Sequence, residues 1–180
     1  MPIDRSAECP MIPTAIVLHG PTSAGKTSLA RALQDRSEVP TFHITLDAFV
    51  EMSRRRDMRS DEELNRALQI HYRNLRSTLR RVAESHFDIV LDLVLRNDSE
   101  FDACLAALAS RPTFVIGVCA PLEVLEERER SRPDRAEGMA KSQFGHPAYS
   151  RPYSMRLDTS VVSAQEGADI VRSFVTSQVS

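Results

Sequence analysis

The chain of 180 residues has the length of one ordinary domain, and its 42% hydrophobic and 27% charged residues are typical of a globular protein. A net charge of −2 gives no general attraction to nucleic acid or anionic lipid, and no apolar run is long enough to cross a membrane. Three cysteines without metal-ligand spacing, and an N-terminus without an apolar signal core, favour the reducing cytoplasm. We expect residues 1–13 to form a flexible tail and residues 14–180 to form one domain.

Predicted strands and helices alternate along this domain. The strands are short apolar runs at residues 14–19, 41–46, 89–95, 113–119 and 154–158. The helices are expected at residues 28–34, 61–84, 99–109, just after Pro121, and 163–177. Residues 131–153 show no periodicity and are predicted to form a loop or lid. This alternation predicts an α/β fold with a parallel sheet covered by helices on both faces.

The helix expected at residues 61–84 carries an apolar stripe at three- and four-residue steps. Four arginines lie roughly opposite that stripe: Arg66, Arg73, Arg76 and Arg80. They could form a face that binds anions or nucleic acid. A solvated charged face is the commoner outcome, and we adopt that interpretation.

The segment Gly20-Pro21-Thr22-Ser23-Ala24-Gly25-Lys26-Thr27 has the spacing of a phosphate-binding loop and lies between a predicted strand and a predicted helix. Glycines let the backbone curl so that its N–H groups point at phosphate oxygens, and the helix that includes Ser28 adds its positive end. Lys26 would contact the β- and γ-phosphates, and the Thr27 hydroxyl could bind Mg²⁺. A chance glycine-rich turn is the alternative, and four fixed positions in this context argue against it.

Two aspartates follow or end predicted strands, where ligands bind in open α/β sheets. Asp47 could accept the proton of a hydroxyl that attacks a phosphate, or it could cap the helix that begins at Ala48. Asp92 could bind Mg²⁺, directly or through water, or it could be a hydrogen-bonded carboxylate of the core.

Arginines gather after the fourth predicted strand, at Arg128, Arg130, Arg132 and Arg135. Their guanidinium groups could stabilise the charge that develops during phosphoryl transfer, and Gly138 and Gly145 would allow the segment to close as a lid. Local ion pairs are the alternative, and we expect one between Glu126 and Arg130.

Seven segments, in chain order, resemble the chloramphenicol phosphotransferase-like family: the phosphate loop, Leu46–Phe49, Ile89–Asp92, Arg128–Arg135, Gly138–Ala140, Gln143 and Leu157–Thr159. The resemblance runs from about residue 14 to the C-terminus, and its most specific part is Arg-x-x-x-Arg-x-Asp-Arg followed by Gly-Met-Ala. Asp92 is followed by Leu93, where the founding member of the family has a second acid. The stretch after Asp47 differs most.

The resemblance implies a P-loop kinase with a five-stranded parallel sheet of order 2-3-1-4-5 and an arginine-bearing lid. It implies transfer of the γ-phosphate of ATP, with Mg²⁺, to a hydroxyl of a small molecule such as an antibiotic. Asp47 would be the base, Lys26 and Thr27 would hold phosphates and metal, and Arg132 and Arg135 would belong to the lid. A metabolic or nucleoside kinase of the same fold, and a nucleotide-binding regulator without transfer activity, are the alternatives. We expect neither nucleic acid nor membrane as a partner, and the sequence leaves the oligomeric state open.

Overall fold

The structure, a computed structural model, describes residues 12–54, 58–95, 97–131 and 138–179. Most of the predicted tail and the two arginines Arg132 and Arg135 lie outside these ranges. Five strands form one sheet in the order β2-β3-β1-β4-β5, and all neighbouring strands are parallel. Their bounds are β1 Ala15–His19, β2 Thr41–Thr45, β3 Asp88–Leu93, β4 Thr113–Cys119 and β5 Met155–Asp158. The predicted strands and the strand order are confirmed.

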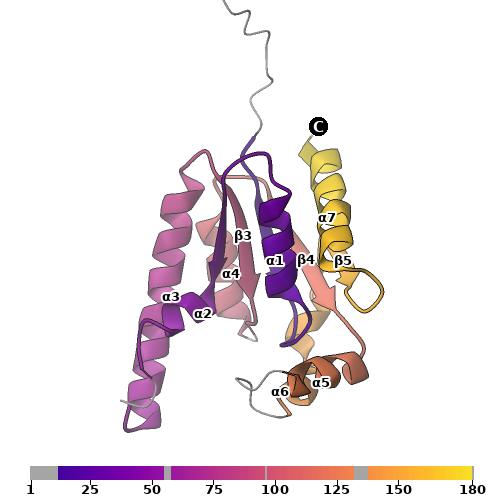
Figure 1. The fold of residues 1–180 in the computed structure, drawn as a ribbon. Helices are drawn as coiled ribbons and strands as arrows, with labels where there is room; N and C mark the ends of the chain where they lie inside the picture. The colour runs from indigo at the N-terminus through magenta and orange to yellow at the C-terminus, as the bar shows by residue number, and fades with distance from the viewer. Residues whose placement is uncertain (1–11, 55–57, 96, 132–137, 180) are drawn as a thin grey trace, which may run out of the picture.

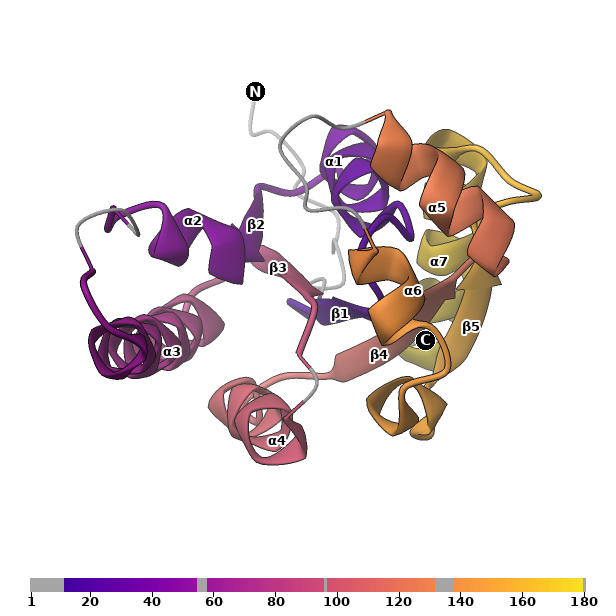
Figure 2. The ribbon, with the colours of Figure 1, turned by 90° about the horizontal axis from the view of Figure 1, so that it is seen from below.

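Helices cover both faces of the sheet, as Figures 1 and 2 show, with α1 and α7 on one face and α3 and α4 on the other. Three shorter helices, α2, α5 and α6, gather at the edge where the strands end. The bounds are α1 Lys26–Asp35, α2 Leu46–Val50, α3 Asp61–Ala83, α4 Asp98–Ala107, α5 Leu122–Arg130, α6 Met139–Gln143 and α7 Ala164–Val179. Among the described residues, no helix is both long and apolar enough to cross a membrane.

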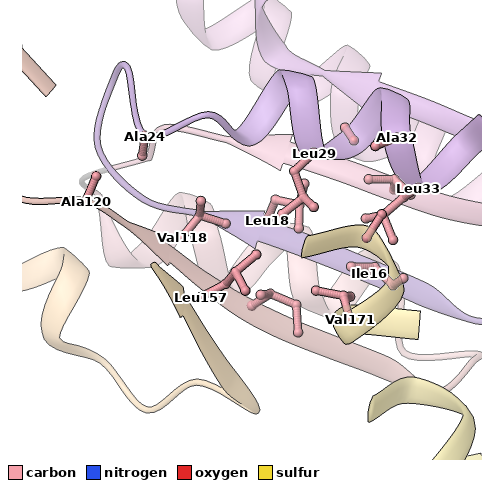
Figure 3. Close-up of a cluster of buried hydrophobic side chains, with 14 of the residues drawn as sticks. Ile16, Leu18, Ala24, Leu29, Ala32, Leu33, Val118, Ala120, Leu157 and Val171 are labelled. Carbon is pink, nitrogen blue, oxygen red and sulfur yellow. The ribbon is translucent and has the colours of Figure 1, made fainter. Parts of the chain in front are cut away.

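The central strand β1 is apolar except for His19 because both of its faces are buried. Ile16 and Leu18 pack against α1 and α7, and Figure 3 shows Leu18 beside Leu29 of α1. Ala15 and Val17 point to the opposite face, under α3 and α4. Each such leucine or isoleucine side chain contributes on the order of 2 kcal/mol to folding. This packing on both faces fixes the position of β1, and so of the point at which the predicted phosphate loop begins.

Helix α3 confirms the prediction for residues 61–84 and begins at an N-cap, Ser60, whose side chain accepts a hydrogen bond from the Glu63 N–H. Its apolar stripe is fully buried only in the second half, at Leu75 and Leu79. The solvated-face interpretation is wrong for Arg76, because that side chain is largely buried and pairs with Glu100 of α4. This ion pair joins two helices on the same face of the sheet.

Part of the segment predicted to form a loop or lid, residues 131–153, is helical. Helix α6 and a short 3₁₀ helix, η2 (Pro147–Ser150), lie there. These elements are too short to show a periodic apolar pattern in the sequence. A buried carboxylate holds the start of α6: Glu129 accepts hydrogen bonds from the N–H groups of Gly138 (2.9 Å) and Ala140 (2.8 Å).

Candidate active site

The predicted phosphate loop joins β1 to α1. Gly25, at φ 85°, is the N-cap of α1, a backbone conformation that glycine adopts without strain. Gly20 is required for a different reason, since a Cβ atom there would lie 2.0 Å from the carbonyl oxygen of Val118. Ser23 has φ 60° and is the one non-glycine residue with a positive φ in the described ranges. The loop curls as a phosphate-binding loop does, and it ends at the positive end of α1.

Lys26 and Thr27 are the first two residues of α1, and both face the carboxyl edge of the sheet. Lys26 is only 5% exposed, and its Nζ donates a hydrogen bond to the carbonyl oxygen of Pro21 at 2.7 Å. The Thr27 hydroxyl donates to Oδ2 of Asp92 at 2.7 Å. Asp92 reaches it because β3 pairs with β1 in a register that sets Asp92 beside Leu18, just before the loop. Three predicted site residues, Lys26, Thr27 and Asp92, therefore lie close together.

Asp92 is buried but stays charged. Burial alone would raise the pKa of its carboxyl, but His43, Lys26 and the Thr27 hydroxyl outweigh burial and hold the pKa below its ordinary value of 3.8. The nearest approach of His43, 3.9 Å from Nε2 to Oδ2, is too long for a hydrogen bond, so its effect on this pKa is electrostatic. Both interpretations of Asp92 therefore have support, because it is a hydrogen-bonded carboxylate and it lies beside a predicted metal ligand.

The residues present here fit a magnesium ion held together with nucleotide phosphates. The hydroxyl of Thr27 and the carboxylate of Asp92 are oxygen ligands of the kind that Mg²⁺ prefers, and they are adjacent. Within the described ranges, no three or more His, Cys, Asp or Glu side chains lie together in a way that could hold a metal ion. A site with one carboxylate and substrate phosphates is the usual arrangement for this ion.

Asp47 lies at the same edge, but it does not cap a helix. Helix α2 begins at Leu46, and its N-cap is Thr45, whose side chain accepts a hydrogen bond from the Asp47 N–H at 3.3 Å. The capping interpretation of Asp47 is therefore wrong. The side chain is exposed and lines a cavity of about 80 Å³ together with Lys26, Thr27 and Asp92.

A second cavity, of about 350 Å³, lies on the other side of the loop. Its lining includes three predicted nucleotide-binding residues, Ser28, Gly25 and Arg128, and residues that follow β5. The Arg128 guanidinium donates to the hydroxyl of Thr159 at 2.9 Å and to its carbonyl oxygen at 2.8 Å. This cavity has room for the base and sugar of a nucleotide whose phosphates lie in the loop.

Thr159 and Gln143, to which sequence reasoning gave no role beyond the family resemblance, contact the phosphate loop. The Thr159 hydroxyl donates to the Ala24 carbonyl oxygen at 2.9 Å, and Oε1 of Gln143 accepts from the Thr22 N–H at 2.7 Å. Their partners lie more than a hundred residues away in the sequence, so no local pattern signals them. Arg130 forms a local ion pair, but its partner is Glu127, at 2.6 Å, and not the expected Glu126.

A buried histidine connects the start of the loop to its neighbours. Nε2 of His19 donates to the Leu95 carbonyl oxygen at 2.7 Å, so Nδ1 accepts from the Tyr153 hydroxyl at 3.0 Å. Burial, partly offset by the Leu95 hydrogen bond, lowers the pKa of His19 from 6.5 to about 4. The imidazole ring of His19 is therefore uncharged in the folded protein at neutral pH.

Acid should destabilise the protein through this residue. The pKa of His19 is about 4 when folded and 6.5 when unfolded, so its stabilisation is complete above pH 6.5 and is lost as the pH falls toward 4. We expect the free energy of unfolding to fall by about 1 kcal/mol per pH unit in this window. His19→Gln should be less stable at neutral pH but should lack this dependence, while His86→Gln, at an exposed histidine, should retain it. Urea unfolding at a series of pH values measures both, and equal slopes in all three proteins would contradict the assignment.

Solved structures share the fold across nearly the whole chain. A kinase-like protein from Chloroflexus aurantiacus is 22% identical, with a TM-score of 0.70 over 93% of this chain and 98% of that one. The tunicamycin resistance protein of Deinococcus radiodurans is 17% identical, with a TM-score of 0.64 and coverages of 91% and 95%. Shikimate kinase from Acinetobacter baumannii, in complex with shikimate, is 18% identical, with a TM-score of 0.62 and coverages of 94% and 96%.

The sheet order, the phosphate loop and these neighbours define the fold of a P-loop kinase. The sequence also matches a described family, chloramphenicol phosphotransferase-like protein, over residues 13–176. The chain belongs to the chloramphenicol phosphotransferase-like family. No curated protein matches it in sequence.

Proposed function

We propose that this protein transfers the γ-phosphate of ATP to a hydroxyl group of a small molecule. The observation that carries the proposal is the cavity in which Asp47 lies with Lys26, Thr27 and Asp92. A carboxylate at the open end of a phosphate loop is where an acceptor hydroxyl would approach the terminal phosphate. A protein that only bound nucleotide would need no carboxylate at this position.

Lys26 places its positive charge within the loop, where the β- and γ-phosphates would lie. On ATP binding, Nζ would exchange the Pro21 carbonyl oxygen for phosphate oxygens. The charge that develops on those oxygens in the transition state is then stabilised by a group already in place, which is the largest contribution that such sites make. Arg132 and Arg135 are proposed to add to this stabilisation.

Thr27 and Asp92 are the residues that would hold Mg²⁺. The ion, when bound, neutralises charge on the β- and γ-phosphates. The lowered pKa of Asp92 means that its carboxylate stays ionised at neutral pH and needs no proton loss before it binds a cation.

Asp47 is proposed to act on the acceptor. Its carboxylate accepts the proton of the hydroxyl while the hydroxyl oxygen forms its bond to phosphorus and the bond from phosphorus to the ADP oxygen breaks. Thr45 holds the first turn of α2 and so fixes the backbone on which Asp47 is carried. The side chain is exposed, as is needed for contact with a substrate that enters from solvent.

The acceptor is proposed to be a small hydroxylated compound, with an antibiotic among the candidates. Family membership supports an antibiotic, and so does the fold shared with a tunicamycin resistance protein. The fold shared with shikimate kinase supports a small metabolite. Both kinds of compound carry the hydroxyl group that the proposed chemistry needs.

An acceptor screen tests the proposal. ADP release is measured with ATP and Mg²⁺ in the presence of individual antibiotics, nucleosides, sugars and hydroxy acids. We expect at least one compound to raise ADP release well above the rate with water alone, and Asp47→Asn to abolish that increase. Nucleotide binding without acceptor-dependent ADP release across the whole set would instead favour a nucleotide-binding regulator.

A further inference from the structure

Side chains from the last third of the chain hold three consecutive residues of the phosphate loop by their backbone groups. The Thr22 N–H donates to Oε1 of Gln143 at 2.7 Å. The Ser23 carbonyl oxygen accepts from Nη1 of Arg128 at 3.4 Å, and the Ala24 carbonyl oxygen accepts from Oγ1 of Thr159 at 2.9 Å. They come from α6, from α5 and from the turn after β5. Figure 2 shows α5 and α6 lying over the edge where the strands end.

The Gln143 contact is the shortest of the three and the most buried. Thr22 is 2% exposed and Gln143 is 4% exposed, so the bond is shielded from water in the folded protein. A buried N–H without an acceptor strongly disfavours the conformation that leaves it so. The loop conformation around Thr22 therefore depends on this glutamine.

The loop also needs external support at the next residue. Ser23 has φ 60°, a left-handed conformation that is unfavourable for a residue with a Cβ atom. Such a residue persists only where its surroundings fix it. The bonds to Thr22, Ser23 and Ala24 supply that fixation on both sides of the strained residue.

Gln143 is itself placed by a second contact. Helix α6 has five residues, far too few to be stable alone. Its first turn is held by Glu129, a buried carboxylate that accepts the Gly138 and Ala140 N–H groups. Ala140 also packs in the hydrophobic core, so α6 is held by this packing, by Glu129 of α5 at its start and by the contact of Gln143 with the phosphate loop at its end.

We propose that Gln143 is a positioning residue for the phosphate loop, which it holds in the conformation that accepts a nucleotide polyphosphate. Glu129 supports it by fixing α6. The inference rests on the nucleotide binding in the proposed function, but its first test needs no nucleotide. A residue that only fills space in the core would leave the Thr22 amide and the nucleotide affinity unchanged when replaced by a side chain of similar volume.

The first test is hydrogen exchange at the Thr22 amide in the protein without nucleotide, followed by NMR. We expect slow exchange in the wild type, fast exchange in Gln143→Met, which lacks the acceptor oxygen, and slow exchange restored in Gln143→Glu, which retains one. Fast exchange in the wild type, or equal rates in the two variants, would overturn the proposal. Fast exchange in the wild type overturns the proposal whether or not Gln143→Met folds, and Gln143→Glu against the wild type then still tests the need for an acceptor oxygen.

The second test is the affinity for a fluorescent ATP analogue. Gln143→Met should bind it roughly tenfold more weakly, the effect of one lost buried hydrogen bond. The matched control is Gln34→Met. Gln34 too bonds a backbone group through its side-chain amide, although as a donor, to the Thr41 carbonyl oxygen, and it lies at the far end of α1. Its affinity should stay at the wild-type value. Equal affinities of Gln143→Met and Gln34→Met would overturn the proposal. A wild type that binds no nucleotide but whose Thr22 amide exchanges slowly would overturn the proposed function, and the exchange rates would still decide whether Gln143 fixes the loop.

Discussion

Lys26→Ala is expected to lower turnover by about a thousandfold at saturating ATP, with a smaller loss of ATP affinity. A thousandfold corresponds to about 4 kcal/mol of transition-state stabilisation. Lys26 is buried inside the phosphate loop, and in the proposed complex its charge would face the terminal phosphates. Because negative charge on those oxygens rearranges during transfer, the lysine stabilises the transition state more than the bound ground state.

Steady-state kinetics with the acceptor found in the screen, together with direct ATP binding, measures this effect. The other lysine of the sequence, Lys141, is exposed on α6 and provides the control. Lys141→Ala should keep the wild-type turnover. Near-normal turnover of Lys26→Ala under saturating ATP would show that the loop does not bind the reacting phosphates.

Asp47→Asn is expected to lower turnover by roughly 10²–10⁴-fold, the range for loss of a general base, while ATP affinity and melting temperature stay near their wild-type values. Asparagine keeps the size and hydrogen-bonding capacity of the side chain but does not accept a proton. Because Thr45, and not Asp47, caps α2, the substitution does not remove a helix cap. In a loose transition state the attacking oxygen has formed little of its bond to phosphorus, so removal of its proton contributes less to the rate. Part of the effect of Asp47→Asn would then come from the loss of orientation of the acceptor hydroxyl.

Glu51→Gln is the matched control for Asp47→Asn. Glu51 is an exposed acid at the other end of α2, and it is not among the residues that line the cavity with Lys26. Its replacement should leave turnover unchanged. A folded Asp47→Asn protein with intact turnover would remove Asp47 from the mechanism and leave the reaction without a named base.

Local patterns in the sequence were sufficient for the strands and the phosphate loop, whereas the order of the strands in the sheet came from the family resemblance. A strand buried on two faces must be apolar throughout, and Ala15–His19 is nearly so. A loop that curls around phosphates needs glycine where φ is positive or where a neighbouring strand approaches, as at Gly25 and Gly20. The meeting of Thr27 and Asp92 then follows from the pairing of β1 with β3.

The supports of the loop were beyond the reach of local patterns. Gln143 and Thr159 act on residues that are distant in sequence, and neither residue type is by itself a sign of a site. Helix α6 escaped prediction because the side chain of Glu129 holds its first turn, whereas an amphipathic stripe would have been visible in the sequence. The role of Asp47 was ambiguous for a related reason, because a strand end and a helix start meet there and only the structure shows that Thr45 is the cap.

The most direct test of the proposed activity follows the γ-phosphate itself. Phosphorus NMR of ATP, Mg²⁺, the purified protein and a mixture of hydroxylated acceptors distinguishes a phosphate ester from free inorganic phosphate. The proposed function predicts that the ATP signals give way to those of ADP and one new phosphate monoester, and that Asp47→Asn forms this ester at least a hundredfold more slowly. Release of inorganic phosphate alone, or an ester formed equally fast by Asp47→Asn, would contradict it.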